Sequence, residues 1–375
     1  MRKTKIRVLH VVDSLSKKSG VSSFVMNLYK NIDRELISFD FMICVKYSQS
    51  YEDEVMRLGG NVVFINNPLS LKTMTIANRN AKEFFDRNAK KYDIVHLHSA
   101  SLCEFTVRHA YNNGIFNIII HSHSSMFSCN PIKKFLHRIL ILRLKKYAKH
   151  YWMCSNEAGQ FLYGKNFCKH NKTELIYNAV ETEKFSFCIE KRNELRNLMG
   201  LESKIIVLHI SNYSPLKNHT FLVDVIKKTN DRIAYVFIGE GPAKKQFKIR
   251  IYKEGLDSKC VFIGQVSNVN DYLQMADLVV LPSIREGLPV TIVEAQAAGV
   301  PCLISNTITK DVCVERVDYL SLNQMQWIKY INSFTALDNE EREKASFSLK
   351  NSVFNIEKEA NRVSFLYYKM LQTNK

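Results

Sequence analysis

Several signatures of common protein classes are missing from this 375-residue chain. No apolar stretch reaches the roughly 20 residues that a membrane-spanning helix requires. There is no C-x-x-C pair, and the nine cysteines are odd in number and scattered, which disfavours a disulfide framework and a cysteine-based zinc site. The cysteines therefore indicate a reduced, cytoplasmic protein.

Motifs for several kinds of nucleotide and ester chemistry are absent as well. The chain has no D-x-D pair of the kind that holds a metal-bound nucleotide sugar, no G-x-x-x-x-G-K-[ST] phosphate loop and no G-x-S-x-G nucleophile elbow. The stretch "GEGP" (239–242) lacks the third glycine of a dinucleotide fingerprint, so taken alone it indicates a tight turn. The sequence therefore offers no motif for a metal-bound nucleotide sugar, a P-loop nucleotide or a nucleophilic serine.

Acidic residues are few relative to basic ones, with 36 Asp and Glu against 53 Lys and Arg and a net charge of +17. A surplus of this size implies an anionic partner: nucleic acid, an anionic membrane surface or a phosphate-bearing substrate. No nucleic-acid motif and no interleaving of aromatic and basic residues accompanies the charge. We therefore predict no nucleic-acid partner and retain the other two.

Short apolar runs alternate with polar, helix-like segments along the whole chain. The runs lie at 5–12, 39–45, 61–65, 92–98, 117–123, 151–155, 174–178, 204–211, 233–240, 260–264, 276–283 and 301–305. Near-continuous Val, Ile and Leu runs of this kind are typical of parallel strands that helices cover on both faces. The pattern predicts an α/β fold with two doubly wound, Rossmann-like domains and a final helix at about 355–371. The charged segment 182–203 has no strand signal and is the best linker candidate.

The stretch "REGLPVTIVEAQAAGVP" (285–301) directly follows a predicted strand. In parallel sheets, ligands bind beyond the carboxyl ends of the strands, and with two such domains the cleft between them is the expected site. Pro289 fits the first helical position, and Gly299 and Pro301 fit the helix end. The amides from Gly287 to Val290 then form an anion site, flanked by two carboxylates that can accept hydroxyl hydrogen bonds, Glu286 and Glu294. The alternative is a capped surface helix with two solvated glutamates.

Three further loops follow predicted strands. Lys217, in "SNYSPLKNH" (211–219), is a point charge suited to a diphosphate, and Gly20, in "SKKSGVSSF" (16–24), allows close approach of a ligand to the backbone. His121 and His123 are two residues apart, so they face the same side of a strand, and a histidine that hydrogen-bonds a sugar or phosphate is more plausible there than a metal ligand. Ordinary turns, surface lysines and packed histidines are the respective alternatives.

The segment "PIKKFLHRILILRLKKYAKH" (131–150) is strongly basic and contains no acidic residue. On one helix, four of its cations form a stripe: Lys134, Arg138, Lys145 and Lys149. A basic amphipathic helix is typical of attachment to an anionic membrane surface. A helix that packs on the sheet with a solvated basic edge is the alternative.

Seven stretches of the sequence, in order, carry a resemblance to a known family. They are "SGVSSFVMNLYKNID" (19–33), "HSHS" (121–124), "LIYNAVETEKF" (175–185), "PLKNHTFLVDV" (215–225), "FIGEGP" (237–242), the long block 261–305 and "NTITKDV" (306–312). Together they resemble the retaining glycosyltransferases of family 4, which have the GT-B fold, and most closely the bacterial exopolysaccharide and capsule branch. The block 261–305 is the specific one.

The resemblance implies a domain division and a set of site residues. It implies an acceptor-side domain at 1–181, joined by the C-terminal helix at about 355–375, and a nucleotide-sugar domain at 182–354. It implies catalytic roles for Glu286, His123 and Lys217, with His121 as second choice for the histidine. It implies a donor-binding set consisting of Gly20, Asn212, Lys217, Gly241, Gly264, Glu286, Gly287, Leu288, Pro289, Val290 and Glu294.

The same resemblance implies transfer of a hexose or N-acetylhexosamine from a nucleotide sugar, a UDP-sugar in this branch, to a polyprenyl-diphosphate-linked glycan at the inner face of the cell membrane. It also implies that the transfer needs no cofactor and no essential metal. Two departures from the family thin the phosphate site: Ser211-Asn212 replaces Gly-Arg, and Ser19-Gly20 replaces Gly-Gly. They support an alternative function, a non-catalytic GT-B partner subunit that binds a glycan or an active transferase.

Overall fold

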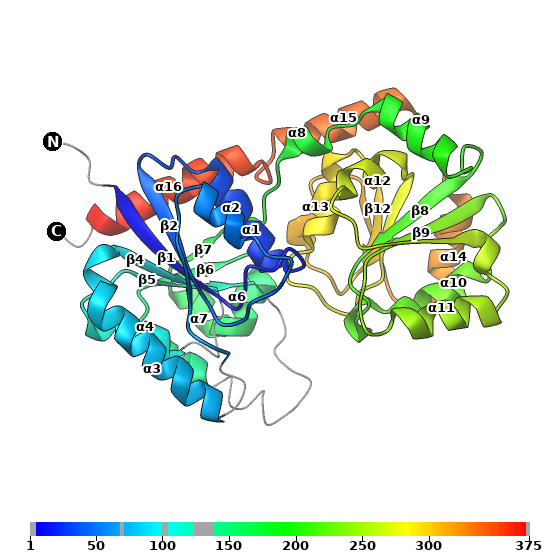
Figure 1. The fold of residues 1–375 in the computed structure, drawn as a ribbon. Coiled ribbons are helices and arrows are strands. Elements are labelled where there is room, and N and C mark those ends of the chain that lie inside the picture. The colour runs from blue at the N-terminus through cyan, green and yellow to red at the C-terminus, as the bar shows by residue number, and fades with distance from the viewer. Residues whose placement is uncertain (1–4, 68–70, 99–103, 124–138, 373–375) are drawn as a thin grey trace. The chain divides into compact units, whose positions relative to one another are not determined.

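The computed structural model describes residues 5–67, 71–98, 104–123 and 139–372, and the chain divides into two compact units. Unit 1 comprises Met1–Ala179 and Ile356–Lys375, and unit 2 comprises Val180–Asn355. Each unit is a parallel sheet with helices on both faces (Figure 1). The α/β class and the parallel strands expected from the sequence are confirmed.

Unit 1 contains a seven-stranded parallel sheet in the order β3-β2-β1-β4-β5-β6-β7. Its strands are β1 (Ile6–Val12), β2 (Ile37–Ile43), β3 (Val62–Phe64), β4 (Ile94–Leu97), β5 (Ile118–Ser122), β6 (His150–Met153) and β7 (Thr173–Leu175). Its helices are α1 (Gly20–Asn31), α2 (Glu52–Arg57), α3 (Leu71–Asn88), η1 (Ala89–Lys91), α4 (Glu104–Asn112), α6 (Asn156–Tyr163), α7 (Lys165–His170) and α16 (Ile356–Gln372).

Two apolar layers cover the faces of the first sheet (Figure 1). One face packs against α3, α4 and α6, and Phe85 and Val107 are fully buried there. The other packs against α1, α2 and α16, where Phe24 and Tyr367 are buried. Burial on both faces explains why β1, β4 and β5 are apolar almost without interruption. The C-terminal helix α16 thus belongs to unit 1, although it follows unit 2 in the chain.

Unit 2 contains a six-stranded parallel sheet in the order β10-β9-β8-β11-β12-β13. Its strands are β8 (Ile205–Ile210), β9 (Ile233–Ile238), β10 (Cys260–Gly264), β11 (Leu278–Leu281), β12 (Cys302–Ser305) and β13 (Val317–Leu320). Its helices are α8 (Thr182–Phe185), α9 (Ile189–Leu198), η2 (Pro215–Lys217), α10 (His219–Ile226), α11 (Lys244–Lys253), η3 (Asp257–Lys259), α12 (Val269–Met275), α13 (Val290–Ala297), η4 (Lys310–Val312), α14 (Gln324–Ser333) and α15 (Asn339–Lys350).

Two expectations about unit 2 are wrong. The segment 182–203 is not a linker, because it forms α8 and α9, and Arg196 of α9 is buried against Asp277. The segment looked like a linker because it is charged and has no strand signal. The sequence pattern does not show that its cations pair with an acid far away in the chain. The edge strand β13 was missed, since the short "VDYL" is only partly buried and carries a weak apolar signal.

Candidate functional site

The strand order of unit 2 brings two of the predicted site loops together. The strands β8 and β11 are neighbours, and the chain continues from β8 toward one edge of the sheet and from β11 toward the other. Such a switch point is where open α/β sheets bind ligands. The two loops join through the amide of Ile284, which donates to the carbonyl of Leu216 at 2.8 Å.

A lysine and a glutamate from these two loops form an ion pair. Lys217 Nζ lies 2.6 Å from Glu286 Oε1, and the two side chains are 20% and 14% exposed. A charge-assisted hydrogen bond at this exposure holds both side chains in place more firmly than a solvated surface pair would. The structure therefore brings together the lysine and the first glutamate that the sequence predicted to share a site.

The helix α13 begins one residue later than the sequence suggested. Pro289 has extended backbone angles (φ −73°, ψ 104°) and is the N-cap, so its predicted place at the first helical position is wrong. The side chain of Pro289 makes no capping hydrogen bond. The first amides of a helix lack partners within it and carry the positive end of the helix dipole, so the segment from Gly287 to Val290 retains the character of an anion site. At the other end Gly299 adopts φ +66°, as expected for the residue after the helix.

Glu294 lies in the interior of α13 and is half-buried. Burial raises the pKa of its carboxyl to about 7, and the nearby cation of Lys184 opposes this rise. A carboxyl group near half-protonation can both donate to and accept from hydroxyl groups. This property suits the predicted contact with ribose hydroxyls.

The glycines of the "GEGP" turn have a structural reason. Gly239 has φ +138°, and a Cβ atom there would lie 1.9 Å from the carbonyl oxygen of Ser211. Gly241 is packed in the same way against the backbone of Tyr213, whereas Gly264 has φ +89° beside Glu240. The turn packs against the loop after β8, where the amide of Tyr213 donates to the carbonyl of Glu240 at 3.1 Å. Asn212 in that loop is exposed.

In unit 1 the loop after β1 leads into α1, and Gly20 is the first residue of that helix. Ser19 caps the helix by accepting a hydrogen bond from the amide of Ser22 at 3.3 Å. Gly20 is exposed, and a Cβ atom added there would meet nothing within 4 Å. The space beside the α carbon of Gly20 is therefore not filled by the described residues, and a ligand could approach the start of α1 there.

Five histidines gather on one face of the sheet of unit 1, at β1, β4 and β5. They are His10, His96, His98, His121 and His123, and all but His123 are buried. His121 accepts or donates a hydrogen bond to His96 at 3.1 Å, and His123 does so with His98 at 2.8 Å. His123, after the carboxyl end of β5, is the more accessible of the two predicted histidines. His10, His96 and His98 were not among the predicted site residues. The H-x-H spacing that recurs at the carboxyl ends of β4 and β5 is the signal that could have pointed to His96 and His98.

Two histidine triads have ligand atoms within 4.8 Å of one another: His10, His96 and His98, and His98, His121 and His123. Neutral imidazoles at this spacing could hold a transition-metal ion. Each triad consists of histidines alone, and their nitrogens already bond to one another, so the donor set lacks the carboxylate or carbonyl that usually orients a ligating histidine.

The predicted basic stripe does not lie on one helix. Lys134 and Arg138 fall outside the described residues, and the helical segment that follows them ends at Leu144. The ammonium group of Lys145 donates to the carbonyl of Tyr163 at 2.7 Å and lies 4.2 Å from the ring centre of Phe167. Burial lowers the pKa of this lysine. Lys145 is thus tied into unit 1, and only Lys149 of the described pair is exposed.

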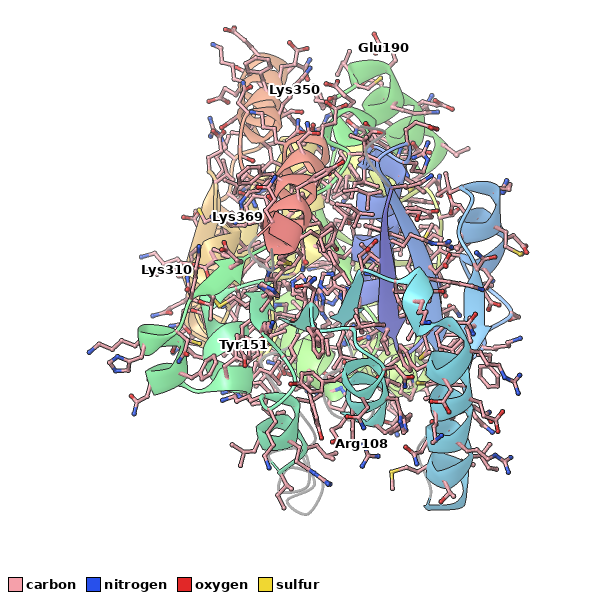
Figure 2. All side chains as sticks on the ribbon, turned by 90° about the vertical axis from the view of Figure 1, so that its left-hand side faces the viewer. Arg108, Tyr151, Glu190, Lys310, Lys350 and Lys369 are labelled. Atoms are coloured by element: carbon pink, nitrogen blue, oxygen red, sulfur yellow. The ribbon has the colours of Figure 1, made fainter. Side chains whose placement is uncertain are left out.

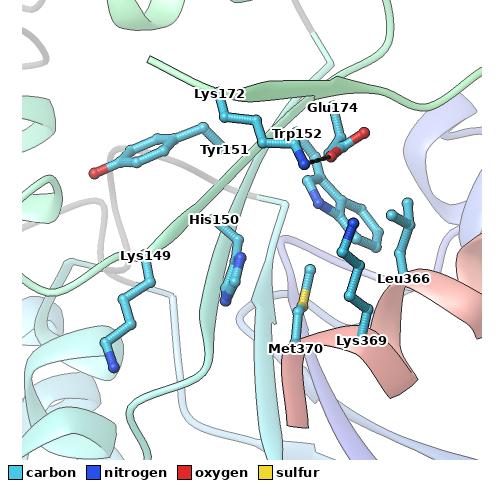
Figure 3. A pocket seen from close by; sticks show the side chains of 9 residues that line it. All are labelled: Lys149, His150, Tyr151, Trp152, Lys172, Glu174, Leu366, Lys369 and Met370. Atoms are coloured by element: carbon cyan, nitrogen blue, oxygen red, sulfur yellow. Dashed lines mark ion pairs between the residues drawn. The ribbon is translucent and has the colours of Figure 1, made fainter. Parts of the chain in front are cut away.

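A cavity of about 190 Å³ lies between β6, β7 and α16 (Figure 3). Its walls combine cations with an apolar floor: Lys149, His150, Tyr151, Trp152, Lys172, Glu174, Leu366, Lys369 and Met370. Lys172 and Glu174 form an ion pair at 3.6 Å. Figure 2 views unit 1 from this side and labels Tyr151 and Lys369. Because β5 and β6 are parallel and His150 begins β6, the cavity lies at the end of the sheet opposite to His123.

Within the described part of the chain, none of the helices has both the length and the apolar character needed to cross a bilayer.

Comparison with known proteins matches family models to both units. The model described as Glycosyltransferase Family 4 matches residues 18–184, and that described as Glycosyl transferases group 1 matches residues 191–344. The chain is 28% identical over 353 residues to the putative glycosyltransferase EpsF of Bacillus subtilis (strain 168), covering 92% of this chain and 91% of that relative. It is 25% identical to the UDP-Gal:alpha-D-GlcNAc-diphosphoundecaprenol alpha-1,3-galactosyltransferase of Escherichia coli, covering 98% of each. Its fold is similar to that of Anabaena HepE in complex with UDP and glucose, with a TM-score of 0.80, 15% identity and coverage of 97% of this chain and 100% of that one.

Proposed function

Since the chain belongs to glycosyltransferase family 4 and has the GT-B fold, we propose that it moves a hexose or N-acetylhexosamine from a UDP-sugar, with retention of configuration, to a lipid-linked glycan in cell-surface polysaccharide synthesis. The observation that carries the proposal is the Lys217–Glu286 pair beside the start of α13, at the switch point of unit 2. The name of the Escherichia coli relative, with a UDP-linked donor and a diphosphoundecaprenol acceptor, supports the donor and acceptor classes.

In this proposal the charge of the leaving group is stabilised by the chain's own residues. The bond between the anomeric carbon and the diphosphate oxygen breaks while the acceptor oxygen bonds to the same face of the sugar. The proton of the acceptor hydroxyl passes to the departing diphosphate. Lys217 and the amides at the start of α13 stabilise the negative charge that develops there. No metal ion is needed for these steps, in keeping with the missing D-x-D pair.

Glu286 has two tasks under this proposal. Before the donor binds, it holds Lys217 in place through the 2.6 Å contact. When the diphosphate arrives, the ammonium can turn to it, and the carboxylate is then available to hydroxyls of the donor sugar. Glu294, farther along α13, would receive the ribose hydroxyls, and His123 of unit 1 would contribute a hydrogen bond to the sugar or phosphate.

A donor screen tests the function. The full chain is incubated with UDP-, GDP- and ADP-sugars and a polyprenyl-diphosphate-linked glycan, and the released nucleotide is measured. We expect release from a UDP-sugar, dependent on the acceptor. The exposed Asn212 and the use of Ser19 as a helix cap favour the alternative of a non-catalytic partner subunit. Calorimetry distinguishes the two, because absence of UDP binding at millimolar concentration would support the partner subunit.

We also propose that the enzyme works at the inner face of the cell membrane, where anionic lipid meets the cavity cations of unit 1. Replacing Lys149 and Lys369 together by glutamate is expected to weaken binding to vesicles that contain phosphatidylglycerol. Each basic residue near such a surface contributes about 1 kcal/mol. A matched double variant, Lys253→Glu with Lys329→Glu, changes two exposed lysines of unit 2 by the same charge. Vesicle sedimentation measures the binding. An equal loss of vesicle binding in both double variants would show that only net charge matters and would contradict a membrane-binding role for the cavity.

A further inference from the structure

Three histidines of unit 1 form one hydrogen-bonded chain that leads from the core to the carboxyl end of the sheet. His10 Nδ1 lies 2.9 Å from His98 Nε2, and His98 Nδ1 lies 2.8 Å from His123 Nε2. His10 and His98 are buried, whereas His123 is only partly so. Both nitrogens of His98 and the Nε2 of His123 are therefore occupied, and among the contacts of the described residues only Nδ1 of His123 is left for a ligand.

The rings are held in this arrangement by their surroundings. The ring centre of His123 lies 4.0 Å from that of His121 and 5.2 Å from that of Phe24. His121 in turn bonds to His96 through its Nδ1, and His96 bonds to the hydroxyl of Tyr367 at 2.8 Å. This second chain uses other nitrogens, so it fixes ring positions without competing for His123.

Counting protons gives the chain a direction. Burial lowers the pKa of His10 and of His123 to about 3, and burial together with the neighbouring histidines lowers the pKa of His98 well below its ordinary value, so each ring is neutral near pH 7 and carries one N–H. Two arrangements satisfy both hydrogen bonds. In one, every ring carries its hydrogen on Nδ1; in the other, every ring carries it on Nε2.

The core end of the chain distinguishes the two arrangements. His10 Nε2 is buried and has no hydrogen-bond partner among the residues that the structure describes. With hydrogens on Nε2, this atom would be an orphaned buried N–H donor, which is rarer in proteins than a buried acceptor lacking a partner. With hydrogens on Nδ1, it is only a lone pair. The arrangement with hydrogens on Nδ1 is therefore favoured, and in it His123 accepts from His98 and carries its own hydrogen on Nδ1.

We propose that His98 and His10 are positioning residues that hold His123 in the Nδ1–H tautomer, so that its ligand-facing nitrogen donates a hydrogen bond. The group that this nitrogen recognises is an acceptor: an oxygen of the donor diphosphate or of a sugar hydroxyl. The ligand part of the inference rests on the function proposed above, whereas the tautomer does not. A neutral donor at this place binds an oxygen without adding a charge that would have to be desolvated in the core.

Nitrogen NMR of the full chain with 15N-labelled histidine tests the tautomer directly. Long-range correlation between ring protons and nitrogens separates Nδ1–H from Nε2–H, and the His123→Gln spectrum assigns the signal. In the unmutated protein we expect Nδ1–H. In His98→Asn, whose side-chain amide can replace Nδ1 of the lost ring, we expect that state to persist. In His98→Leu, which has no donor, we expect it to be lost.

Turnover then separates positioning from folding. We expect kcat/KM to fall tenfold to about a hundredfold in His98→Leu, as for lost partners of metal-bound histidines, and to recover in His98→Asn at similar thermal stability. An Nε2–H signal for His123 in the unmutated protein, or an unchanged signal in His98→Leu, overturns the proposal. Because the NMR signal needs no turnover, inactivity with every donor would reject the proposed function without affecting this result.

Discussion

Replacing Lys217 by alanine is expected to lower kcat for sugar transfer by about 10²- to 10³-fold, the range for loss of one group that stabilises developing negative charge. The reason is the position of its ammonium group, 2.6 Å from Glu286, which shortly precedes the start of α13 in the chain. Asn212 in the same loop is uncharged, so that position offers no second cation to replace the lost charge. Steady-state release of nucleotide from the preferred donor measures the effect.

Lys227→Ala is a matched control, because Lys227 also pairs with a glutamate of unit 2, Glu254, but at an exposed position. We expect it to retain full activity. Glu286→Ala should cost a comparable factor, and the double variant with Lys217→Ala should lose less than the product of the two single losses, since the residues act as a unit. Unchanged turnover in both single variants would show that the site lies elsewhere.

Asp277→Ala is expected to destabilise unit 2 by about 3–5 kcal/mol, the cost of removing one partner from a buried ion pair. Its carboxylate pairs with Arg192, and it accepts from Arg196 at 3.0 Å and from the amide of Ile206 at 2.8 Å. Arg342 is buried close by, and burial and the other arginines lower its pKa to about 9, an effect that Asp277 opposes. Without the aspartate, three guanidinium groups would remain without their shared anion.

Urea unfolding followed by tryptophan fluorescence measures this change unit by unit. The chain has two tryptophans, Trp152 in unit 1 and Trp327 in unit 2, so a Trp152→Phe background reports on unit 2 alone. Asp86→Ala, which removes an exposed partner of Lys82, should leave both transitions in place. An Asp277→Ala transition that coincides with the parent would mean that the arginines find other partners.

Much of the fold follows from local patterns. Every strand except β13 overlaps an apolar run of the sequence, since parallel strands covered on both faces favour near-continuous apolar residues. The block 261–305 is likewise local: strand, loop, Pro289, helix and Gly299 follow one another within it. The family and the GT-B fold expected from these features are confirmed by the comparisons with known proteins. The role of each site residue stays a prediction.

Other features depend on contacts that periodicity does not encode. The basic segment looked like one amphipathic helix up to Lys149, yet the helix ends at Leu144, and the ammonium group of Lys145 donates to the carbonyl of Tyr163. The charged stretch 182–203 looked like a linker until Arg196 found Asp277 about eighty residues away. In both cases a charged side chain binds a partner that is distant in sequence and does not remain in solvent.

The sequence by itself determined the strands other than β13 and the chemical kinds of residue that follow each of them. Only the tertiary structure decided which of them meet: Lys217 with Glu286 across the β8–β11 switch point, and His10 and His98 behind His123 across β1, β4 and β5. The physical reason is that hydrophobic periodicity reports which face of an element is buried, whereas the order of strands in a sheet sets which loops become neighbours.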